Sequence, residues 1–348
     1  MMRDEREPRT IRIIAPSQSM ATLRPDVCRV GIARLERLGF RVELGAHVRE
    51  VALHRTASVA HRLADLDAAL DDPSVDVVLA AQGGSNSNQL LERIDYARAR
   101  RANKVFVGFS DISALLLALG KHAGASVVHG PSFIDLCNPI LPDYTTKGLL
   151  ACLAGRRVEY ASPSAAAEDL WRSHAPSPPE PHCLFDGWKV LRRGKASGPI
   201  VGGNLATLSA LAGTRHFPET AGRIFFLEDA VGEGAGAIHR ELTHLAQVGA
   251  FDGIAAFLFG KVPAGAPLAS PEMVRAILDD VLAGGGAYPI AFEVTCSHLS
   301  PMVSIPLFRP AELDLDGPPR LIVNADRPGE AVHVDGSDAL TQSVTSSA

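Results

Sequence analysis

The sequence predicts an α/β fold, with a doubly wound parallel sheet in its N-terminal part and a second α/β domain after it. The chain has 348 residues, and at about 150 residues per domain this length suits two domains or one large one. From Arg12 onward, short apolar runs alternate with amphipathic stretches, which is typical of a parallel sheet covered by helices. Apolar residues make up 46% of the chain and charged residues 21%, so the chain can bury a large core and is not disordered.

The first domain is expected over residues 10–135, where strands and helices alternate. Short apolar runs predict the strands, and apolar residues spaced by three and four positions predict the helices. Glycine marks a helix end, as at Gly39. The predicted strands are residues 11–15, 41–44, 75–80 and 104–109, and the predicted helices are residues 24–38, 57–70, 86–94 and 112–122.

A change of composition marks the end of this domain. Residues 161–187 are rich in Ala, Ser, Pro and Glu, and proline is excluded from helix interiors, so residues 136–190 are expected to form a linker and surface loop. A second α/β domain is expected over residues 191–325, followed by a loose polar tail at residues 326–348. Its predicted strands are residues 199–201, 223–227, 254–259 and 289–294, and its predicted helices are residues 205–212, 238–248 and 271–282.

Charge, cysteine content and the N-terminal sequence limit which partners and which cellular compartment we expect for this protein. The 34 basic and 39 acidic residues leave a net charge of −5, so the chain has no overall cationic field for nucleic acid. Residues 1–10 lack the apolar segment of a secretion signal, and glycines in the charge-free residues 196–214 argue against a membrane span. The five cysteines form no C-x-x-C pair, which favours reduced thiols. We expect a cytoplasmic protein without nucleic-acid or membrane partners, disulfide framework or structural zinc.

The sharpest local pattern in the chain surrounds Ser110. An apolar strand breaks at Gly108, Ser110 follows, and an apolar helix begins directly afterwards. Such a turn presents a serine at the carboxyl edge of the sheet, beside the backbone N–H groups of the next helix, as in nucleophilic serines of hydrolases. Because the glycine that commonly follows such a serine is missing, Ser110 or Asp111 as a simple helix N-cap remains an alternative.

A second loop, residues 80–88, follows another predicted strand. Gly83 and Gly84 allow a sharp turn and a close approach of backbone amides to a ligand, which could complete an oxyanion hole. The loop has neither the G-x-G-x-x-G pattern of dinucleotide sites nor the lysine of a P-loop. An ordinary turn between a strand and a helix explains it equally well.

Two carboxylates and a histidine stand out in the second domain. Glu228 and Asp229 end an apolar strand, where a carboxylate needs a cationic or histidine partner to offset its desolvation; surface capping is the alternative. His298 lies in a loop after a predicted strand, which suits a catalytic base and also a structural histidine. His239 and His244 do not have the spacing of two metal ligands on one helix face, so no metal site is expected.

Five short motifs, taken in order, resemble one family. They are Gln82-Gly-Gly-Ser, Gly108-Phe-Ser-Asp, Gly202-Gly-Asn-Leu, Leu227-Glu-Asp and Ser297-His. Their succession is similar to that in the LD-carboxypeptidase family of serine peptidases, which includes the microcin C self-immunity peptidases. The resemblance covers most of the chain. It implies a flavodoxin-like N-terminal domain that supplies a nucleophilic serine and a C-terminal α/β domain that supplies a glutamate and a histidine.

Carried onto this sequence, the family's Ser-His-Glu triad implies Ser110 as nucleophile, Glu228 as orienting carboxylate and His298 as general base. The resemblance also implies an oxyanion hole formed by the backbone amides of Gly84 and Asp111. General chemistry agrees with these roles, because the serine needs a base to accept its proton and the base needs an anion to fix its tautomer.

Three further residues are candidates for substrate binding. Asn204, in the Gly-Gly-Asn motif, could hold the substrate near the scissile bond, or cap the helix that follows it. Trp171 could stack on a nucleotide base, as aromatic side chains do, or pack within its own loop. A glutamate at position 233 is similar to the pattern in the branch of the family that acts on muropeptides, which makes Glu233 the third candidate.

The resemblance leaves two classes of substrate open. The muropeptide branch cuts an L-to-D peptide bond in cell-wall tetrapeptides, and the immunity branch cuts the bond between an acidic amino acid and an adenylate-like nucleotide. The long loop around Trp171 resembles the immunity branch, whereas Glu233 and the absence of a lysine just after the Glu-Asp pair do not. The sequence also departs from the family at Phe109, where tyrosine is more common, and at Ser297, where glycine usually precedes the histidine.

We therefore expect a carboxypeptidase-type serine hydrolase that takes a small peptide or a peptidyl-nucleotide, forms a homodimer as its relatives do, and uses no cofactor and no metal. The alternative is a catalytically silent protein that binds a peptide or nucleotide on the same fold. Replacing Ser110 by Ala would distinguish the two, since only a hydrolase would lose turnover.

Overall fold

The computed structural model describes residues 9–167, 183–230, 232, 234–284 and 286–335. These residues form two compact units, one up to residue 139 and the other from residue 140 onward. We describe each unit by itself. Among the helices of the described ranges, none has the length and apolar character needed to cross a membrane.

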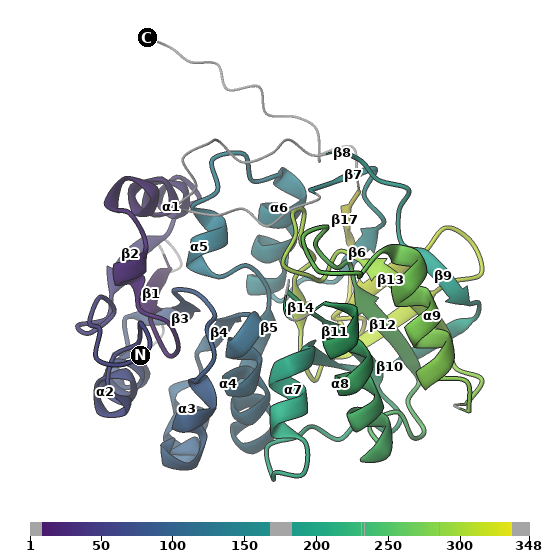
Figure 1. The fold of residues 1–348 in the computed structure, drawn as a ribbon. Coiled ribbons are helices and arrows are strands. Elements are labelled where there is room, and N and C mark those ends of the chain that lie inside the picture. The colour runs from purple at the N-terminus through teal and green to yellow at the C-terminus, as the bar shows by residue number, and fades with distance from the viewer. Residues whose placement is uncertain (1–8, 168–182, 231, 233, 285, 336–348) are drawn as a thin grey trace. The chain divides into compact units, whose positions relative to one another are not determined.

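A parallel sheet forms the centre of the first unit (Figure 1). Its strands are β1 (Thr10–Ile14), β2 (Arg41–Leu44), β3 (Val75–Ala80), β4 (Val105–Gly108) and β5 (Ser126–His129). They lie in the order β2-β1-β3-β4-β5, and each neighbouring pair is parallel. This is the strand order of a flavodoxin-like sheet, so the predicted fold class is confirmed for this unit.

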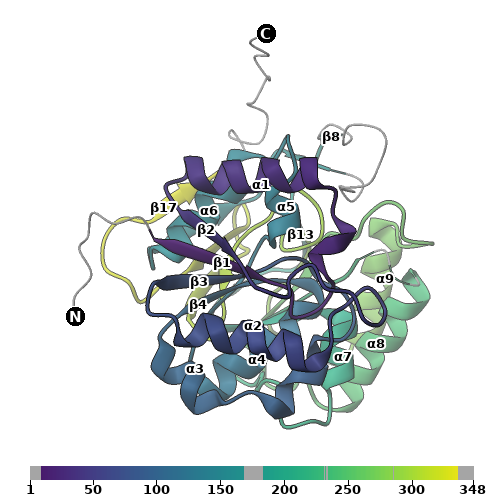
Figure 2. The same cartoon turned by 90° about the vertical axis from the view of Figure 1, so that its left-hand side faces the viewer.

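Helices cover both faces of this sheet. They are α1 (Pro25–Arg37), α2 (Val59–Asp71), α3 (Tyr96–Ala102), α4 (Ser113–Ala118) and α5 (Phe133–Leu136), with the 3-10 helices η1 (Met20–Thr22), η2 (Ser87–Arg93) and η3 (Ser110–Ile112) and the π-helix η4 (Leu119–Ala123). Figure 2 shows α1 on one side of the strands and α2, α3 and α4 on the other. The single helix predicted over residues 112–122 is thus divided, and residues 86–94 form mainly a 3-10 turn instead of an α-helix.

The second unit is built on a sheet of mixed direction. Its strands are β6 (Val158–Ala161), β9 (Lys189–Arg192), β10 (Lys195–Asn204), β11 (Ile224–Glu228), β12 (Ala256–Gly260), β13 (Ile290–Val294), β15 (Pro310–Asp314), β16 (Arg320–Val323) and β17 (Val332–Val334). Their order is β17-β6-β16-β15-β10-β11-β12-β13-β9. The run from β10 to β13 is parallel, and β10 also pairs with β15 in the antiparallel sense through its first half. Short strands β7 (Ala165–Ala166), β8 (Cys183–Leu184) and β14 (Ile305–Pro306) complete the unit.

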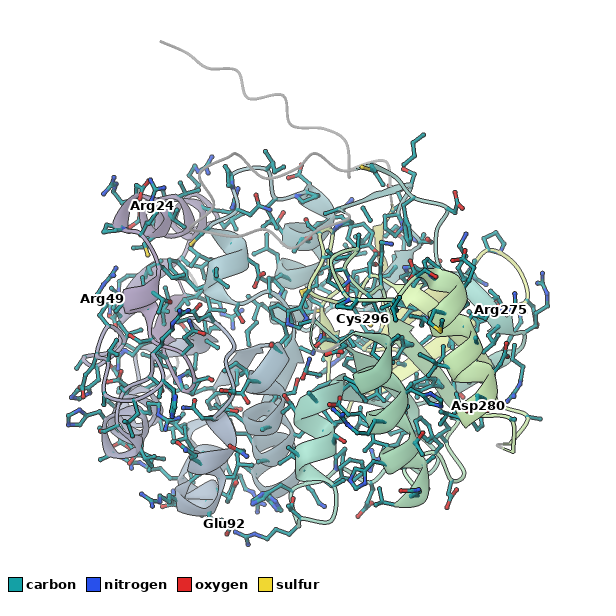
Figure 3. All side chains as sticks on the ribbon, viewed as in Figure 1. Arg24, Arg49, Glu92, Arg275, Asp280 and Cys296 are labelled. Atoms are coloured by element: carbon teal, nitrogen blue, oxygen red, sulfur yellow. The ribbon has the colours of Figure 1, made fainter. Side chains whose placement is uncertain are left out.

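Three helices of the second unit, α7 (Leu205–Leu211), α8 (Ala235–Gln247) and α9 (Pro271–Val281), pack side by side in the layer seen in front of the parallel strands in Figure 1. The strands beneath them, β11, β12 and β13, are fully buried. The rings of Phe251 and Phe257 pack edge to face, with their centroids 5.2 Å apart. Figure 3 shows Cys296 inside this unit and Arg275 and Asp280 projecting from α9. The second α/β domain predicted from the sequence is therefore present.

Two segments of the second unit differ from the sequence prediction. Residues 136–190, expected as a linker and surface loop, contain the helix α6 (Asp143–Leu153) and the strand β6. Each buries one face, and the hydroxyl of Tyr160 in β6 donates a hydrogen bond to the carbonyl of Ser304 at 3.0 Å. The prediction was wrong because it extended the loop expected from the proline-rich residues 161–187 back to residue 136.

The expected tail is also wrong at residues 332–334. These residues form β17, which pairs in parallel with β6. A strand of three residues carries too little alternation of apolar and polar side chains to be recognised in the sequence.

Candidate active site

Ser110 lies at the carboxyl edge of the first sheet, where it begins η3 and follows Phe109, the first residue after the end of β4. Its backbone φ is 60°, an unusual conformation for a residue other than glycine, and such strain often marks a functional turn. Gly108 permits the turn, because a Cβ on this residue would lie 2.8 Å from a side-chain carbon of Ile112. Neither Ser110 nor Asp111 caps η3 or α4 with its side chain. The helix-cap alternative is therefore wrong, and Ser110 is a partly exposed residue at this turn.

The loop with Gly83 and Gly84 packs directly against this turn. A Cβ on Gly83 would lie 2.8 Å from Ser110 Oγ and 3.6 Å from the backbone nitrogen of Asp111. Gly84 has a φ of 154°, and a Cβ there would lie 2.3 Å from Ser17 Oγ. Glycine is thus required at both positions, because any side chain would displace the serine turn or its neighbours.

Asp111 ties this loop to the serine turn. Its buried Oδ2 accepts hydrogen bonds from Ser17 Oγ at 2.5 Å, from the backbone N–H of Asn86 at 2.9 Å and from the backbone N–H of Ser87 at 2.8 Å. Ser87 Oγ donates to the carbonyl oxygen of Asp111 at 2.6 Å. The side chain of Asp111 therefore fixes the loop, while its backbone nitrogen remains beside Ser110.

Sequence reasoning missed Arg62, which supports the same loop from α2. Its guanidinium is buried and donates to the carbonyl oxygens of Pro16 at 3.0 Å and Asn86 at 3.1 Å, and to Gln89 Oε1 at 2.6 Å. Burial lowers the pKa of this arginine, and the charge of Asp111 opposes that effect. In the sequence Arg62 is one polar residue within an amphipathic helix, so no local signal separates it from solvated arginines.

Glu228 and His298 form the central contact of the second unit. Glu228 ends β11, its side chain is 0% exposed, and its Oε2 lies 2.6 Å from His298 Nδ1. Because a carboxylate can only accept, the proton in this hydrogen bond lies on Nδ1, so in the neutral imidazole Nε2 is the nitrogen that carries the lone pair. Glu228 and His298 therefore contact each other within this unit, and Glu228 is not a surface cap, because its side chain is fully buried.

The strands around Glu228 explain its burial. Asn204, at the end of β10, is paired in register with Glu228, and Gly260 ends β12 on the other side of β11. A Cβ on Gly260 would lie 2.7 Å from Glu228 Cβ and 3.2 Å from Ser297 Cβ. Side chains at the carboxyl ends of parallel strands commonly form ligand sites. Here glycine at the neighbouring strand end provides the space for the glutamate.

Asp229, next to Glu228, is also buried. Burial and the adjacent charge of Glu228 raise the pKa of Asp229 from its ordinary value to about 7. Its Oδ1 accepts a hydrogen bond from the backbone N–H of Ala230 at 2.9 Å. Glu228 Oε1 has no hydrogen-bond partner among the described residues. The raised pKa means that Asp229 holds its proton below about pH 7, so Glu228 is the carboxylate that acts on the imidazole.

Asn204 caps the following helix, as the alternative interpretation predicted. Its Oδ1 accepts from the backbone N–H of Thr207 at 3.1 Å, and its Nδ2 lies 3.4 Å from the carbonyl oxygen of Glu228. Trp171 and Glu233, the other two candidates for substrate binding, lie outside the described residues. The coordinates thus group the site residues by unit, with Ser110, Asp111 and Gly84 in the first and Asn204, Glu228 and His298 in the second.

Comparison with known proteins identifies both units. The LD-carboxypeptidase N-terminal domain matches residues 11–130, and the LD-carboxypeptidase C-terminal domain matches residues 197–313. The murein tetrapeptide carboxypeptidase of Pseudomonas aeruginosa is 32% identical over 297 residues, which are 84% of this chain and 86% of that protein. The microcin C7 self-immunity protein MccF of Escherichia coli is 27% identical over 302 residues, 82% of this chain and 85% of its own.

Solved structures agree with this assignment. An MccF-like protein of Bacillus anthracis has a TM-score of 0.86 and 28% identity, and the match covers 91% of this chain and 97% of that one. MccF in complex with aspartyl sulfamoyl adenosine has a TM-score of 0.82 at 24% identity, covering 91% and 96%. Since the family's two domains match the two units and a relative above 30% identity spans most of the chain, this protein belongs to the LD-carboxypeptidase family of peptidases.

Proposed function

We propose that this protein is a carboxypeptidase-type serine hydrolase in which Ser110 is the nucleophile, His298 the general base and Glu228 the carboxylate that orients the base. The observation that carries the proposal is the 2.6 Å hydrogen bond between His298 Nδ1 and the fully buried Glu228. A buried carboxylate on Nδ1 fixes the tautomer in which Nε2 can accept a proton, and it stabilises the imidazolium formed afterwards.

The reaction follows from these roles. Ser110 Oγ attacks the carbonyl carbon of the scissile bond and gives its proton to Nε2 of His298. The backbone N–H groups of Gly84 and Asp111 hold the resulting oxyanion. The C–N bond then breaks, the leaving amine takes the proton from His298, and water hydrolyses the acyl-serine with the same base. The mechanism requires Ser110 Oγ and His298 Nε2 to come within hydrogen-bond distance during turnover.

Features of the first unit support the role of Ser110. The positive φ of the serine and its close packing on Gly83 are properties of a nucleophile held in a sharp strand-to-helix turn. The backbone nitrogen of Asp111 lies in that same turn, and hydrogen bonds of its own side chain fix the adjacent loop. Donors fixed before the reaction starts are the ones that stabilise an oxyanion most effectively.

We propose a muropeptide as the first substrate to test, with cleavage of an L-to-D peptide bond. The comparison with the Pseudomonas aeruginosa murein tetrapeptide carboxypeptidase favours it. The segment after the Glu-Asp pair favours it as well, because the lysine with which the immunity branch commonly holds a substrate carboxylate has no counterpart there. Residues 229–233 carry no lysine or arginine.

An aminoacyl-nucleotide is the second candidate. The similarity to MccF, which has been solved with aspartyl sulfamoyl adenosine bound, favours it. Trp171 would then stack on the base. The two candidates share the same nucleophile and base, so they differ in what the protein binds and not in how it breaks the bond.

The test offers both substrates to the intact protein and to a Ser110→Ala variant. Hydrolysis of a cell-wall tetrapeptide to tripeptide and D-alanine is expected, with a loss on the order of 10⁴-fold or more in the variant while substrate binding is retained. Preferential cleavage of an aspartyl-adenylate analogue would select the second candidate. Binding of either compound without hydrolysis by the wild-type chain would instead support a catalytically silent binding protein.

Two attributes of the protein also remain proposals. A cytoplasmic location is supported by the cysteines, all five of which are free thiols with four of them buried. A homodimer rests on the family resemblance, and light scattering of the purified chain tests it.

A further inference from the structure

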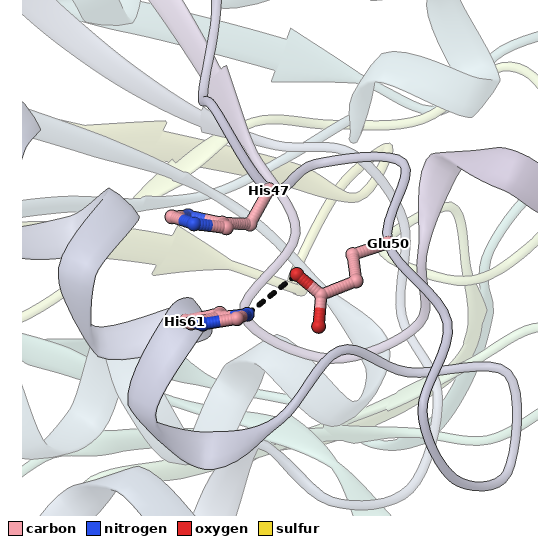
Figure 4. Close-up of side chains that lie close together, drawn as sticks. All are labelled: His47, Glu50 and His61. Atoms are coloured by element: carbon pink, nitrogen blue, oxygen red, sulfur yellow. Dashed lines mark hydrogen bonds and ion pairs between the residues drawn. The ribbon is translucent and has the colours of Figure 1, made fainter.

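Two histidines and a glutamate form a cluster in the first unit, away from the serine turn in the sequence. His47 and Glu50 lie in the turn that follows β2, and His61 lies in the first turn of α2. One potential ligand atom from each residue lies within 4.8 Å of the others. Figure 4 shows the two imidazole rings facing each other, with the carboxylate of Glu50 beside His61.

The geometry of the three side chains is defined by specific contacts. The rings of His47 and His61 are stacked, with centroids 4.2 Å apart and an interplanar angle of 19°. Because the lone pair of an imidazole nitrogen lies in the plane of its ring, one of the two rings must turn when both bind a single ion. Glu50 Oε2 lies 2.5 Å from His61 Nδ1. All three residues are partly exposed, so an ion can reach them from solvent.

A fourth residue, Asp65, orients His47. Its buried carboxylate lies 2.9 Å from His47 Nδ1 and also accepts the backbone N–H of His47 at 3.1 Å. Gly45 makes room for this carboxylate, since a Cβ there would lie 2.5 Å from Asp65 Oδ2. A carboxylate on the far nitrogen of a metal-binding histidine is a recurrent feature of zinc sites, because it fixes the ring and the tautomer. His47 is thus held with Nε2 directed away from Asp65.

We propose that His47, Glu50 and His61 bind a divalent cation of the zinc type, with Asp65 as the residue that positions His47. Two imidazoles and one carboxylate are a common set of protein ligands for zinc, with water in the fourth position. Protons and the ion compete for the same imidazole nitrogens and carboxylate oxygens, so binding weakens as the pH falls.

The position of the cluster indicates what the ion would do. Glu50 and His61 flank residues 51–58, a segment that exposes Val51 at 54% and Leu53 at 70%. A metal bound to both flanks closes this segment into a loop anchored on β2 and α2. Because it binds the folded chain and not the unfolded one, it also raises the midpoint of thermal unfolding.

The experiment titrates the metal-free full-length protein with Zn²⁺ by calorimetry and with Co²⁺ by visible absorption. One equivalent is expected to bind, with the absorption of four-coordinate Co²⁺ and a rise in the unfolding midpoint on adding Zn²⁺. His61→Gln and Glu50→Gln should each weaken binding on the order of 100-fold, and Asp65→Asn by about 10- to 100-fold. Circular dichroism before metal addition verifies that each variant is folded.

Two control variants separate this site from other histidines. His239→Gln removes an exposed histidine that contacts a single carboxylate, Asp280, at 2.9 Å, and His298→Ala removes the proposed catalytic base. Both should retain the full equivalent of metal. The proposal is overturned if the wild-type chain binds no Zn²⁺ at micromolar concentration, or if His61→Gln and Glu50→Gln bind Zn²⁺ as tightly as the wild type.

Discussion

The nucleophile turn of the first unit and the Glu-His pair of the second unit are held in place by different means. The position of Ser110 depends on backbone conformation, with a positive φ at the serine and glycines where any side chain would collide. The position of His298 depends on charge, with a fully buried carboxylate 2.6 Å from its ring. The first arrangement is sensitive to added volume, and the second is sensitive to added or removed charge.

This difference assigns distinct tasks to the two regions. A nucleophile must be placed to within about 1 Å of its target, which packing and backbone geometry achieve. A base must exchange a proton without losing its orientation, which a desolvated anion achieves by stabilising the charged ring. Four predictions test whether the two regions fail in these different ways.

The largest effect is expected from breaking the Glu-His pair. His298→Ala removes the base, and Glu228→Gln removes the charge while it preserves the shape of the side chain. Each should reduce kcat by up to about 10⁴-fold, and combining His298→Ala with Ser110→Ala should add little, because the residues act as a unit. Steady-state rates on a muropeptide measure this, with His239→Gln as the surface control. Nearly wild-type turnover in Glu228→Gln would contradict the proposed role of the carboxylate.

The sequence predicts the nucleophile turn better than its surroundings. The succession of apolar strand, Gly108, Ser110 and apolar helix is local, so one short window contains the information that folds it. The Glu-His contact joins residues that are 70 positions apart, and each residue alone suits several roles. In the sequence, only the order of the five motifs connects Glu228 with His298. The structure of the second unit shows that the two side chains lie within hydrogen-bond distance.

Other features were beyond reach of the sequence because they depend on tertiary contacts. Arg62 differs from a solvated arginine only through the carbonyl oxygens that surround it. The cluster of His47, Glu50 and His61 forms because a turn meets a helix, and the spacing of these residues in the chain matches no helical metal motif. Likewise β6 and β17 are short, and their burial becomes evident only when they pair.

The second prediction concerns the charge of Asp229. Its pKa is raised from its ordinary value of 3.8 to about 7, so between these values the folded state binds more protons than the unfolded state. Stability therefore falls as the pH rises from about 4 through 7, by on the order of 4 kcal/mol at ~1.4 kcal/mol per pH unit. Asp229→Asn should remove this decline and melt at a higher temperature above pH 7.

Urea unfolding of the wild type and of Asp229→Asn at pH 5 and pH 8 measures this effect. The difference in the free energy of unfolding between the two proteins should grow with pH. If the two proteins lose stability in parallel between these pH values, burial does not raise the pKa of Asp229 as described.

The third prediction compares added volume in the two regions. Gly83→Ala places a methyl group 2.8 Å from Ser110 Oγ, and Gly260→Ala places one 2.7 Å from Glu228 Cβ. The first should reduce kcat by roughly 10²-fold through displacement of the nucleophile, and the second should mainly reduce stability, by about 1–3 kcal/mol. Gly236→Ala, in α8 with no atom within 4 Å of the new Cβ, is the matched control. Equal losses of kcat in all three variants would refute the distinction between the regions.

The smallest effect is expected from Asp111→Asn, which alters charge in the region that depends on packing. The amide oxygen of asparagine can still accept the three hydrogen bonds that Asp111 Oδ2 accepts. Only the contribution of the negative charge to these hydrogen bonds is lost. The free energy of unfolding should fall by about 1–2 kcal/mol, and kcat should fall less than in Gly83→Ala because the loop keeps its path beside Ser110. Thermal unfolding and steady-state rates check both parts. A collapse of kcat as deep as that of Glu228→Gln would show that the nucleophile turn also relies on charge, and the comparison between the two regions would then fail.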